Sequence, residues 1–301
     1  MTYNFHDIPS SSTWTKIQAI HKGWSGEEKY YIKTKQNKEY LLRIADQSKL
    51  AEERSLYAIY DSLKGKNLPI PEALVSGYCN NGQNTYRLLT WIKGQDANEI
   101  ITNLPKSKQF ELGLQAGRIQ AEFHKLPAPE NDRSWAKYYN WKIDRNLRNY
   151  HDCGSQLSND DCFIDYIHAK RQLLEGRPQC FHHGDFHIGN MLVQDSGQLA
   201  VIDINRLDYG DPYEEFNRMI WNASASTVFA DGLIHGYFSK QVIPRDFFPM
   251  MALYICSNLL GGLSWAIGYG KKEVAIIMEQ SHQIRKWYAN FETSIPCWFN
   301  A

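Results

Sequence analysis

The chain has 301 residues, with 33 basic and 33 acidic side chains, 43% hydrophobic residues and 22% charged residues. This length suffices for two lobes with substantial cores, and the composition is ordinary for a soluble globular protein. Because the charges balance, no overall field attracts nucleic acid or an anionic membrane, so we expect neither as a partner. The six cysteines show no metal-ligand spacing and the N-terminus carries no targeting signal, so we expect reduced thiols in a cytoplasmic protein.

The first third of the sequence predicts a small β-rich region with one helix. Alternating apolar and polar residues indicate strands, and Pro69 and Pro71 interrupt the pattern after the helix. Residues 13–22 fit either a strand or a short amphipathic start. The expected elements are strands at residues 29–33, 39–44, 73–78 and 86–91, with a helix at residues 49–63.

The rest of the sequence is predominantly helical. Gly113 and Gly117 fall on one face of its first long helix, and we expect them to let a neighbouring helix approach closely. The run 247–269 is long and apolar enough to suggest a membrane span, but a proline and a glycine pair interrupt it, so we predict a buried core helix. The expected helices are 107–126, 135–150, 160–174 with Asn159 as its N-cap, 213–221, 247–269 and 273–291.

The polar stretch at residues 180–211, CFHHGDFHIGNMLVQDSGQLAVIDINRLDYGD, contains the residues best suited to chemistry. It predicts two short strands joined by a turn at Asp195-Ser196-Gly197, where glycine tolerates the positive φ of a tight hairpin. We expect the hairpin to bring together Asp185 and Asn190, before its first strand, and Asp203, after its second. Their side-chain oxygens are the ligands that Mg²⁺ prefers when it also binds phosphate groups.

This stretch resembles the catalytic segment of the aminoglycoside phosphotransferase (APH) family, whose fold is kinase-like. Four features match in order: His183-Gly184-Asp185, Asn190, Ile202-Asp203 and Gly210-Asp211-Pro212. The resemblance implies that Asp185 orients a substrate hydroxyl and accepts its proton, and that Asn190 and Asp203 hold Mg²⁺ ions. Asp211 has two open roles, a chemical one and a structural one in which its carboxylate accepts backbone N–H groups of the catalytic loop.

The resemblance also implies a fold and a domain organisation. We expect a bilobal, protein-kinase-like α+β fold, with a small β-rich N-terminal lobe and a larger, mostly helical C-terminal lobe. Residues 1–93 would bind the nucleotide, and residues 94–301 would carry the catalytic and substrate-binding groups, with the active site in the cleft between the lobes. The implied cofactors are ATP or GTP with Mg²⁺, and the implied state is a monomer or weak dimer.

In the N-terminal lobe, small residues at 23–26 are expected to cover the nucleotide phosphates, because their backbone N–H groups can approach phosphate oxygens closely. A simple hairpin turn is the alternative interpretation of the same residues. A second implied contact is a hinge at the end of the last strand, whose backbone bonds the adenine edge. The candidates are Gly23, Ser25 and Gly26 for the phosphates and Thr90, Trp91 and Ile92 for the hinge.

The kinase pattern places a lysine on the strand at residues 39–44, and this chain has Arg43 instead. Arginine keeps the charge and can bind phosphate with two parallel hydrogen bonds, but it is longer and planar, so the replacement is not neutral. An exposed strand arginine is the alternative. On the following helix, Glu53 is the expected partner of Arg43, and Glu52 is a second possibility.

These features predict ATP- or GTP-dependent, Mg²⁺-dependent phosphorylation of a hydroxyl on a small molecule. The resemblance favours an aminoglycoside-type antibiotic, and hence resistance, with carboxylates available to a cationic sugar at Glu214, Glu215 and Asp231. Solvated surface carboxylates are the alternative interpretation of these three residues. Other relatives of the fold phosphorylate choline, homoserine or sugars, so a small-metabolite kinase stays open.

Two other classes of protein also stay open. The replacement of lysine by Arg43 is compatible with a nucleotide-binding pseudokinase that performs no transfer. Three histidines beside Asp185 and Asp203 could instead form a metal hydrolase site, because imidazole and carboxylate groups suit Zn²⁺, Mn²⁺ or Fe²⁺. These histidines are His182, His183 and His187. The hydrolase interpretation leaves Asn190 and the hairpin without a role.

Overall fold

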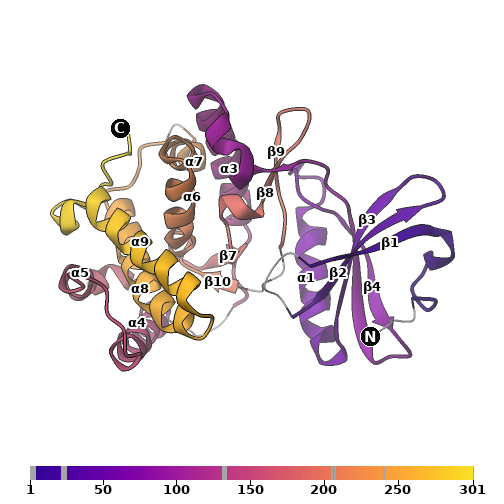
Figure 1. The fold of residues 1–301 in the computed structure, drawn as a ribbon, viewed down its shortest axis with the longest axis horizontal. Coiled ribbons are helices and arrows are strands. Elements are labelled where there is room, and N and C mark those ends of the chain that lie inside the picture. Colours follow the sequence, from indigo (N-terminus) through magenta and orange to yellow (C-terminus); the bar gives the residue numbers. More distant parts are fainter. Residues whose placement is uncertain are drawn as a thin grey trace. The chain divides into compact units, whose positions relative to one another are not determined.

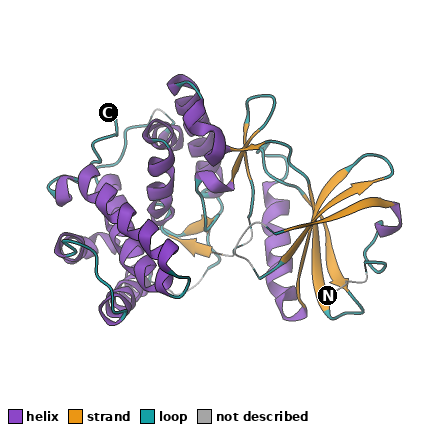
Figure 2. Ribbon diagram, in the orientation of Figure 1, coloured by secondary structure: helices purple, strands orange, loops and turns teal. Residues whose placement is uncertain are grey.

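The computed structural model describes residues 5–21, 26–130, 134–204, 206, 208–239 and 241–300. The chain forms two compact units, one combining Met1–Gln95 with Leu192–Leu207 and the other combining Asp96–Met191 with Asp208–Ala301 (Figure 1). Strands predominate in the first unit and helices in the second (Figure 2), which confirms the predicted α+β class. The division at residue 93 stays a prediction about domains, and the compact units differ from it by grouping Leu192–Leu207 with the N-terminal strands.

The first unit contains a five-stranded antiparallel sheet in the order β1-β2-β3-β5-β4. Alternation along these strands gives the sheet one apolar face, which buries Ile32, Leu42 and Leu88. On the opposite face Lys29 pairs in register with Arg43, and Arg43 with Arg87. The strands are β1 (Trp14–Ile20), β2 (Glu28–Thr34), β3 (Glu39–Asp46), β4 (Ala73–Cys79) and β5 (Asn84–Thr90).

Helix α1 (Leu50–Leu63) packs against β4 and β5 (Figure 1). From this helix the buried Tyr60 hydroxyl donates a 3.0 Å hydrogen bond to the carbonyl oxygen of Ile204. The backbone N–H of Val201 donates to the carbonyl oxygen of Pro69 at 2.9 Å. These two bonds attach the segment around Asp203 to the first unit, although it lies about 140 residues further along the chain.

Short strands form two small sheets, and one of them contains the predicted hairpin. The three-stranded sheet has the order β6-β8-β9, and β7 pairs antiparallel with β10. The Gly197 φ of +79° confirms the glycine turn between β8 and β9. The strands are β6 (Gln95–Asp96), β7 (Cys180–His182), β8 (Met191–Val193), β9 (Leu199–Val201) and β10 (Asp208–Gly210).

The second unit is built from helices around an aromatic core. Phe247 contacts both Phe216 and Phe238 edge to face, with ring centroids 5.0 and 4.8 Å apart. Its helices are α2 (Ala97–Ile100), α3 (Lys106–Phe123), α4 (Trp135–Asp152), α5 (Asp161–Lys170), α6 (Met219–Ala225), α7 (Thr227–Phe238), α8 (Phe247–Ile267) and α9 (Lys271–Trp287).

Helices α3 and α7 are in backbone contact through glycines. A Cβ atom on Gly117 would lie 2.0 Å from the carbonyl oxygen of Leu233, and one on Gly113 would lie 2.2 Å from that of Phe229. Gly232 and Gly236 of α7 meet the backbone of α3 in the same way, at 2.3 and 2.2 Å. The prediction that Gly113 and Gly117 admit a neighbouring helix is therefore confirmed.

Helix α8 is long and apolar enough to cross a membrane, but 67% of its apolar window is buried inside the second unit. Its partners include α4, α5 and α9. One specific contact is the Asn146 amide of α4, which donates to the carbonyl oxygen of Ser257 at 3.0 Å. This burial is typical of a core helix, as predicted.

Two helix boundaries differ from the predictions. Asn159 has a left-handed φ of +54°, so Asp160 precedes α5 in its place. The predicted helix 213–221 is a 3-10 segment, Glu214–Arg218, followed by α6 from Met219. Both Glu214 and Glu215 are buried in this 3-10 segment.

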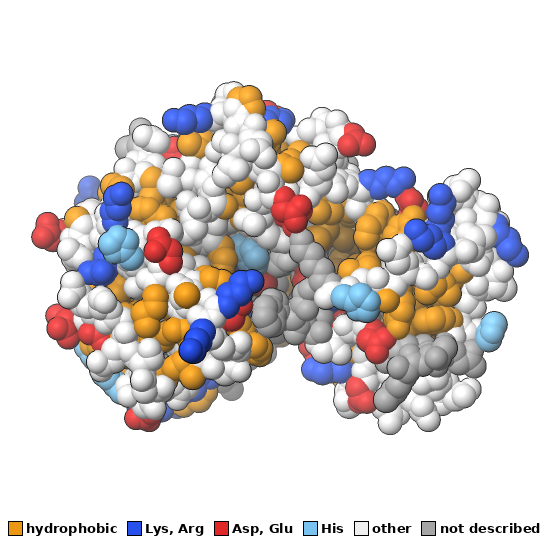
Figure 3. All heavy atoms as spheres, in the orientation of Figure 1, with side chains coloured by type: hydrophobic (Ala, Val, Ile, Leu, Met, Phe, Trp, Pro, Cys, Tyr) orange, Lys and Arg blue, Asp and Glu red, His pale blue; other side chains and the backbone are white. Residues whose placement is uncertain are grey.

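The surface agrees with the balanced composition. On the face drawn in Figure 3, basic and acidic side chains are interspersed, and neither sign gathers into one large patch. All six cysteines are free thiols, as the sequence predicts.

Candidate active site

In the second unit, Asp185 and Asn190 lie on one loop and contact each other. The loop leaves β7 through Gly184, whose φ of +83° favours glycine, and returns through a 3-10 turn, Ile188–Asn190. The Asn190 amide donates to the Asp185 backbone oxygen at 3.0 Å and to its Oδ2 at 3.3 Å. The asparagine therefore fixes the orientation of the carboxylate that the sequence assigns as the base.

The buried carboxylate of Glu215 anchors this loop through a backbone hydrogen bond. Glu215 Oε1 accepts the backbone N–H of Gly184 at 2.6 Å, and its Oε2 lies 3.0 Å from His124 Nε2. Burial opposes ionisation of Glu215, but the His124 hydrogen bond and nearby histidines lower its pKa to about 2. Burial lowers the pKa of His124, and the contact with Glu215 opposes this shift. Further along the loop, Asn222 Oδ1 accepts the Ile188 N–H at 2.8 Å.

Asp211 is fully buried and has structural partners. Its carboxylate accepts two hydrogen bonds from Arg177, at 2.7 and 3.0 Å, and one from the Tyr254 hydroxyl at 2.6 Å. It also accepts the backbone N–H of Tyr213 at 3.0 Å. The structural role is thus favoured over the chemical one, but the expected partners were wrong, since Arg177 and Tyr213 replace the catalytic-loop N–H groups.

In the first unit, Asp203 lies beside a row of cations. The backbone of Asp203 is left-handed, with a φ of +70°. Its Oδ1 forms an ion pair with Arg43 Nη1 at 2.5 Å. Arg43 is 3% exposed and also contacts Glu27 through its Nε. Burial opposes the charge of Arg43, but Glu27 and Asp203 raise its pKa overall. Burial lowers the pKa of Lys29, and Asp203 partly offsets this.

The predicted pairing of Glu53 with Arg43 is wrong in this structure. Glu53 Oε2 lies 3.4 Å from Arg87 Nε, and both side chains are buried. The reason is that α1 packs against β4 and β5, so its glutamate reaches the cation of β5 first. Burial raises the Glu53 pKa, and Arg87 only partly counters it. Glu52 is paired with Lys49 at 2.7 Å instead.

The remaining nucleotide-lobe candidates are placed as follows. Gly23 and Ser25 lie outside the described residues, and Gly26 lies in an open bend where a Cβ atom would meet nothing within 4 Å. At the hinge, the Thr90 and Trp91 N–H groups are already donated to Glu72 and Glu39. Within the described chain, no backbone partner takes the N–H of Ile92. Ile92 is therefore the hinge candidate best able to bond a ligand.

The three carboxylates proposed for a cationic sugar are engaged by protein groups. Lys142 Nζ pairs with Glu214 at 2.8 Å, which lowers the Glu214 pKa despite burial. Glu215 anchors the catalytic loop, as described above. Asp231 is 4% exposed and accepts the backbone N–H and the side-chain amide of Asn300, at 3.1 and 2.8 Å. The alternative interpretation, solvated surface carboxylates, is wrong for all three.

Sequence reasoning missed Arg218, which lies directly beside Asp185. Its Nε is 3.1 Å from Asp185 Oδ1, and its guanidinium lies 5.1 Å from the ring centroid of Trp221. On the other carboxylate oxygen, His187 Nε2 lies 3.5 Å from Asp185 Oδ2. Arg218 ends the 3-10 segment that begins at Glu214. It follows Glu215 by three residues, which is one turn of a 3-10 helix, and this spacing was the available signal that both side chains lie on the same face. Lys29 was also missed, because its strand register with Arg43 is not visible in the sequence.

The histidines do not support the metal hydrolase interpretation. Among described residues, one cluster with metal-ligand spacing consists of His124, Cys180 and His182, with ligand atoms within 4.8 Å of one another. Both His124 nitrogens already have partners, and His182 Nε2 bonds the backbone oxygen of Asp211 at 3.0 Å. Burial raises the pKa of the Cys180 thiol, which disfavours the thiolate that a metal requires.

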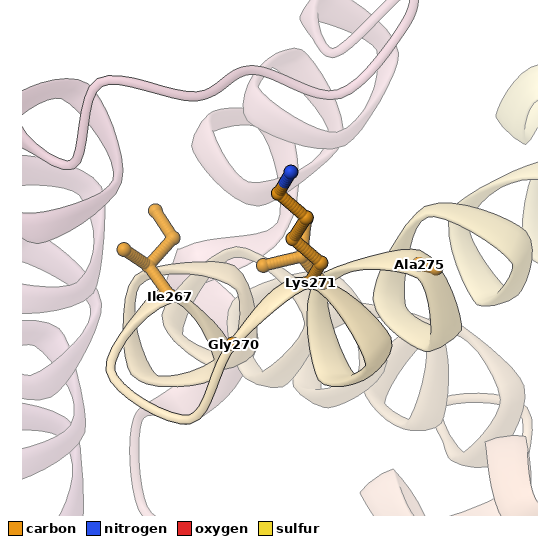
Figure 4. A pocket seen from close by; sticks show the side chains of 5 residues that line it. Ile267, Gly270, Lys271 and Ala275 are labelled. Carbon is orange, nitrogen blue, oxygen red and sulfur yellow. The ribbon is translucent and has the colours of Figure 1, made fainter.

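A surface pocket of the second unit lies away from these residues. It is formed where α8 ends and α9 begins, and Figure 4 shows it with Lys271 beside it. The lining residues are Ile267, Gly270, Lys271, Val274 and Ala275. This lining offers no carboxylate, imidazole or hydroxyl for catalysis.

An Asp–Asn loop, a hairpin ending in a second aspartate and a buried cation on β3 define a kinase-like phosphotransferase. Residues 16–250 match the sequence profile of the phosphotransferase enzyme family (APH). The chain therefore belongs to this family of enzymes, as its catalytic motif predicts. No protein with a curated description matches the sequence significantly.

Solved structures share the fold at low sequence identity. The GDP complex of a mutant aminoglycoside 2′-phosphotransferase-IIIa has a TM-score of 0.69 and 16% identity, covering 96% of this chain and 97% of that one. A thermostable aminoglycoside phosphotransferase APH(4)-Ia mutant, in a ternary complex with ADP and hygromycin B, has a TM-score of 0.65 and 16% identity over 91% and 94%. A candidate fructosamine-3-kinase from Haemophilus somnus has a TM-score of 0.61 and 15% identity over 90% and 91%. The predicted kinase-like fold is confirmed.

Proposed function

We propose that this enzyme transfers the γ-phosphoryl group of ATP or GTP to a hydroxyl group of a small molecule. The observation that carries the proposal is the Asp185–Asn190 pair on a loop whose Gly184 N–H is accepted by the buried Glu215. Structurally similar enzymes bound to GDP, or to ADP with hygromycin B, support the use of a nucleotide and a small acceptor.

In the proposed reaction, Asp185 accepts a hydrogen bond from the acceptor hydroxyl and holds its oxygen in line with the γ-phosphorus. A bond forms between that oxygen and phosphorus, the bond from phosphorus to the β-phosphate oxygen breaks, and the hydroxyl proton passes to the Asp185 carboxylate. The protein performs little covalent chemistry, so its contribution is positioning and electrostatic stabilisation.

Asn190 of the second unit and Asp203 of the first unit each carry a side-chain oxygen of the kind that Mg²⁺ prefers. The side-chain amide nitrogen of Asn190 donates to Asp185. Within the described chain, no hydrogen-bond donor contacts its amide oxygen, which is therefore the atom that could bind a metal. Asp203 carries a carboxylate on a side chain that is 26% exposed. Asn190 and Asp203 would hold the metal, which would neutralise phosphate charge when bound.

The cation row of the first unit supports a nucleotide-binding role. Arg43 remains charged in its buried position, and the neighbouring Lys29 is half-buried and within electrostatic reach of Asp203. We propose that these two side chains balance the triphosphate, with Gly26 near the phosphates and Ile92 at the adenine edge. This arrangement favours an active enzyme over a pseudokinase, because the charge of the missing lysine is retained.

The acceptor has two candidate classes. An aminoglycoside, and hence antibiotic resistance, is supported by family membership and by the similar folds. A small metabolite is the second candidate, and one observation favours it: Glu214, Glu215 and Asp231 are all occupied by protein partners, so they offer little to a cationic sugar.

The test is consumption of ATP and GTP, with and without Mg²⁺, across aminoglycosides, choline, sugars and hydroxy acids. We expect Mg²⁺-dependent consumption that one acceptor class stimulates. If the protein binds neither nucleotide and consumes neither, the proposal is wrong. If the protein binds a nucleotide but consumes none, whether or not an acceptor is present, it is a pseudokinase.

A further inference from the structure

Arg218 carries hydrogen-bonding capacity that the enzyme itself does not use. Its Nε forms the ion pair with Asp185 Oδ1 at 3.1 Å, but no well-oriented hydrogen bond. Within the described chain, its two terminal amino groups have no hydrogen-bond acceptor, and they are not among the buried polar atoms. A guanidinium has five N–H donors in one plane, and within the described chain the four on the terminal amino groups of Arg218 form no hydrogen bond.

The guanidinium is held in place without consuming those donors. It lies 5.1 Å from the Trp221 ring centroid, and the Trp221 ring lies 6.0 Å from that of His187. A cation over an aromatic ring is attracted through its face, which leaves the N–H groups at its edge available. The side chain is 20% exposed, so most of it is shielded from solvent while its tip is accessible.

Arg218 and Asn190 contact opposite oxygens of the same carboxylate. Asn190 and His187 lie at Oδ2 of Asp185, whereas Arg218 lies at Oδ1. The guanidinium of Arg218 therefore lies directly beside the carboxylate that would orient the acceptor hydroxyl.

We propose that Arg218 determines specificity by binding an anionic group, a carboxylate or a phosphate, that the acceptor alcohol carries near its reactive hydroxyl. This inference rests on the proposed function, because that function makes Asp185 the group that orients the hydroxyl. The two terminal amino groups of Arg218 match the two oxygens of a carboxylate or phosphate. A cationic acceptor would instead place its ammonium groups beside a guanidinium, at an electrostatic cost.

The test uses three small alcohols with the same three-carbon skeleton and different charge: glycerate, glycerol and serinol. Their binding to the protein loaded with a non-hydrolysable nucleotide and Mg²⁺ is measured by calorimetry. We expect glycerate to bind at least tenfold more tightly than glycerol or serinol, and Arg218→Gln to abolish this preference. Arg218→Lys should restore part of it, because the charge returns without the planar fork.

Arg145→Gln is the matched control. Arg145 also lies over a tryptophan, 5.0 Å from the ring of Trp141, but it lies on α4 and makes no contact with Asp185. We expect Arg145→Gln to keep the glycerate preference. Equal affinities for the three alcohols in the wild-type protein, or tighter binding of serinol, would overturn the inference.

A second measurement separates an acceptor anion from the γ-phosphate, which has the same chemistry. The affinities for ADP and for the non-hydrolysable triphosphate are compared in the wild-type protein and in Arg218→Gln. If the substitution weakens triphosphate binding tenfold more than ADP binding, Arg218 binds the γ-phosphate and the inference is wrong; an unchanged ratio supports it. Failure of the proposed function would appear differently, as absence of nucleotide binding or turnover with Arg218 intact.

Discussion

Replacing the buried carboxylate under the catalytic loop should destabilise the protein in a pH-dependent way. Glu215 is 2% exposed, and it accepts the Gly184 N–H and a hydrogen bond from His124. Its pKa falls from 4.5 to about 2 in the folded protein. This difference corresponds to about 3 kcal/mol of stabilisation at neutral pH. We expect Glu215→Gln to lose stability of this order.

The pH dependence has a definite sign. A carboxyl group whose pKa is lowered by folding stabilises the protein fully above its unfolded pKa of 4.5, and the contribution disappears as the pH falls through about 2. The difference between wild type and Glu215→Gln should therefore shrink to about 2 kcal/mol at pH 3.5. Urea unfolding followed by circular dichroism at both pH values measures this change.

The matched control is Glu111→Gln, because Glu111 is 55% exposed and its contacts with Lys108 and Gln115 lie on the surface. Its substitution should change the free energy of unfolding by less than about 0.5 kcal/mol at either pH. A Glu215→Gln protein that is as stable as wild type at pH 7 would refute the reasoning. A stability difference that grows toward low pH would also refute it.

Three further predictions concern packing and the cation row. Gly117→Ala should lower the free energy of unfolding by about 3 kcal/mol, measured by thermal unfolding. The control is Gly262→Ala, whose new Cβ atom would lie 3.4 Å from its nearest neighbour and should be neutral or stabilising. Equal effects of the two substitutions would contradict the helix contact. Arg43→Met should lower the free energy of unfolding in urea by about 3 kcal/mol, because it removes the buried cation that pairs with both Glu27 and Asp203; a variant as stable as wild type would contradict the buried network. Asp203→Ala should abolish Mg²⁺-dependent nucleotide consumption while the circular dichroism spectrum stays native, and full activity would remove Asp203 from the metal site.

Local sequence patterns were sufficient to predict most elements of the fold. Alternation predicted the strands of the first unit, and the Asp195-Ser196-Gly197 turn predicted the hairpin that carries Asp203. The spacing of Gly113 and Gly117 predicted a close helix contact, but it could not identify α7 as the partner. The partner depends on tertiary packing, which no local pattern encodes.

The candidate site was predictable only where its residues are close in sequence. Asp185 and Asn190 lie five residues apart on one loop, so a motif captures their contact. The partner of Glu53 was mispredicted, because the choice between Arg43 and Arg87 depends on which strands α1 covers. Burial of Glu214 was missed for a similar reason, since a 3-10 segment replaced the expected amphipathic helix.

The most direct test of the central claim follows the label from [γ-³²P]ATP into an acceptor in the presence of Mg²⁺. The wild-type protein is compared with Asp185→Asn and with Asp195→Asn, which changes an exposed aspartate in the hairpin turn. We predict that wild type and Asp195→Asn label the acceptor at similar rates, and that Asp185→Asn is slower by at least about 10²-fold. Equal labelling by Asp185→Asn and wild type would show that Asp185 does not orient or deprotonate the acceptor, and would contradict the account.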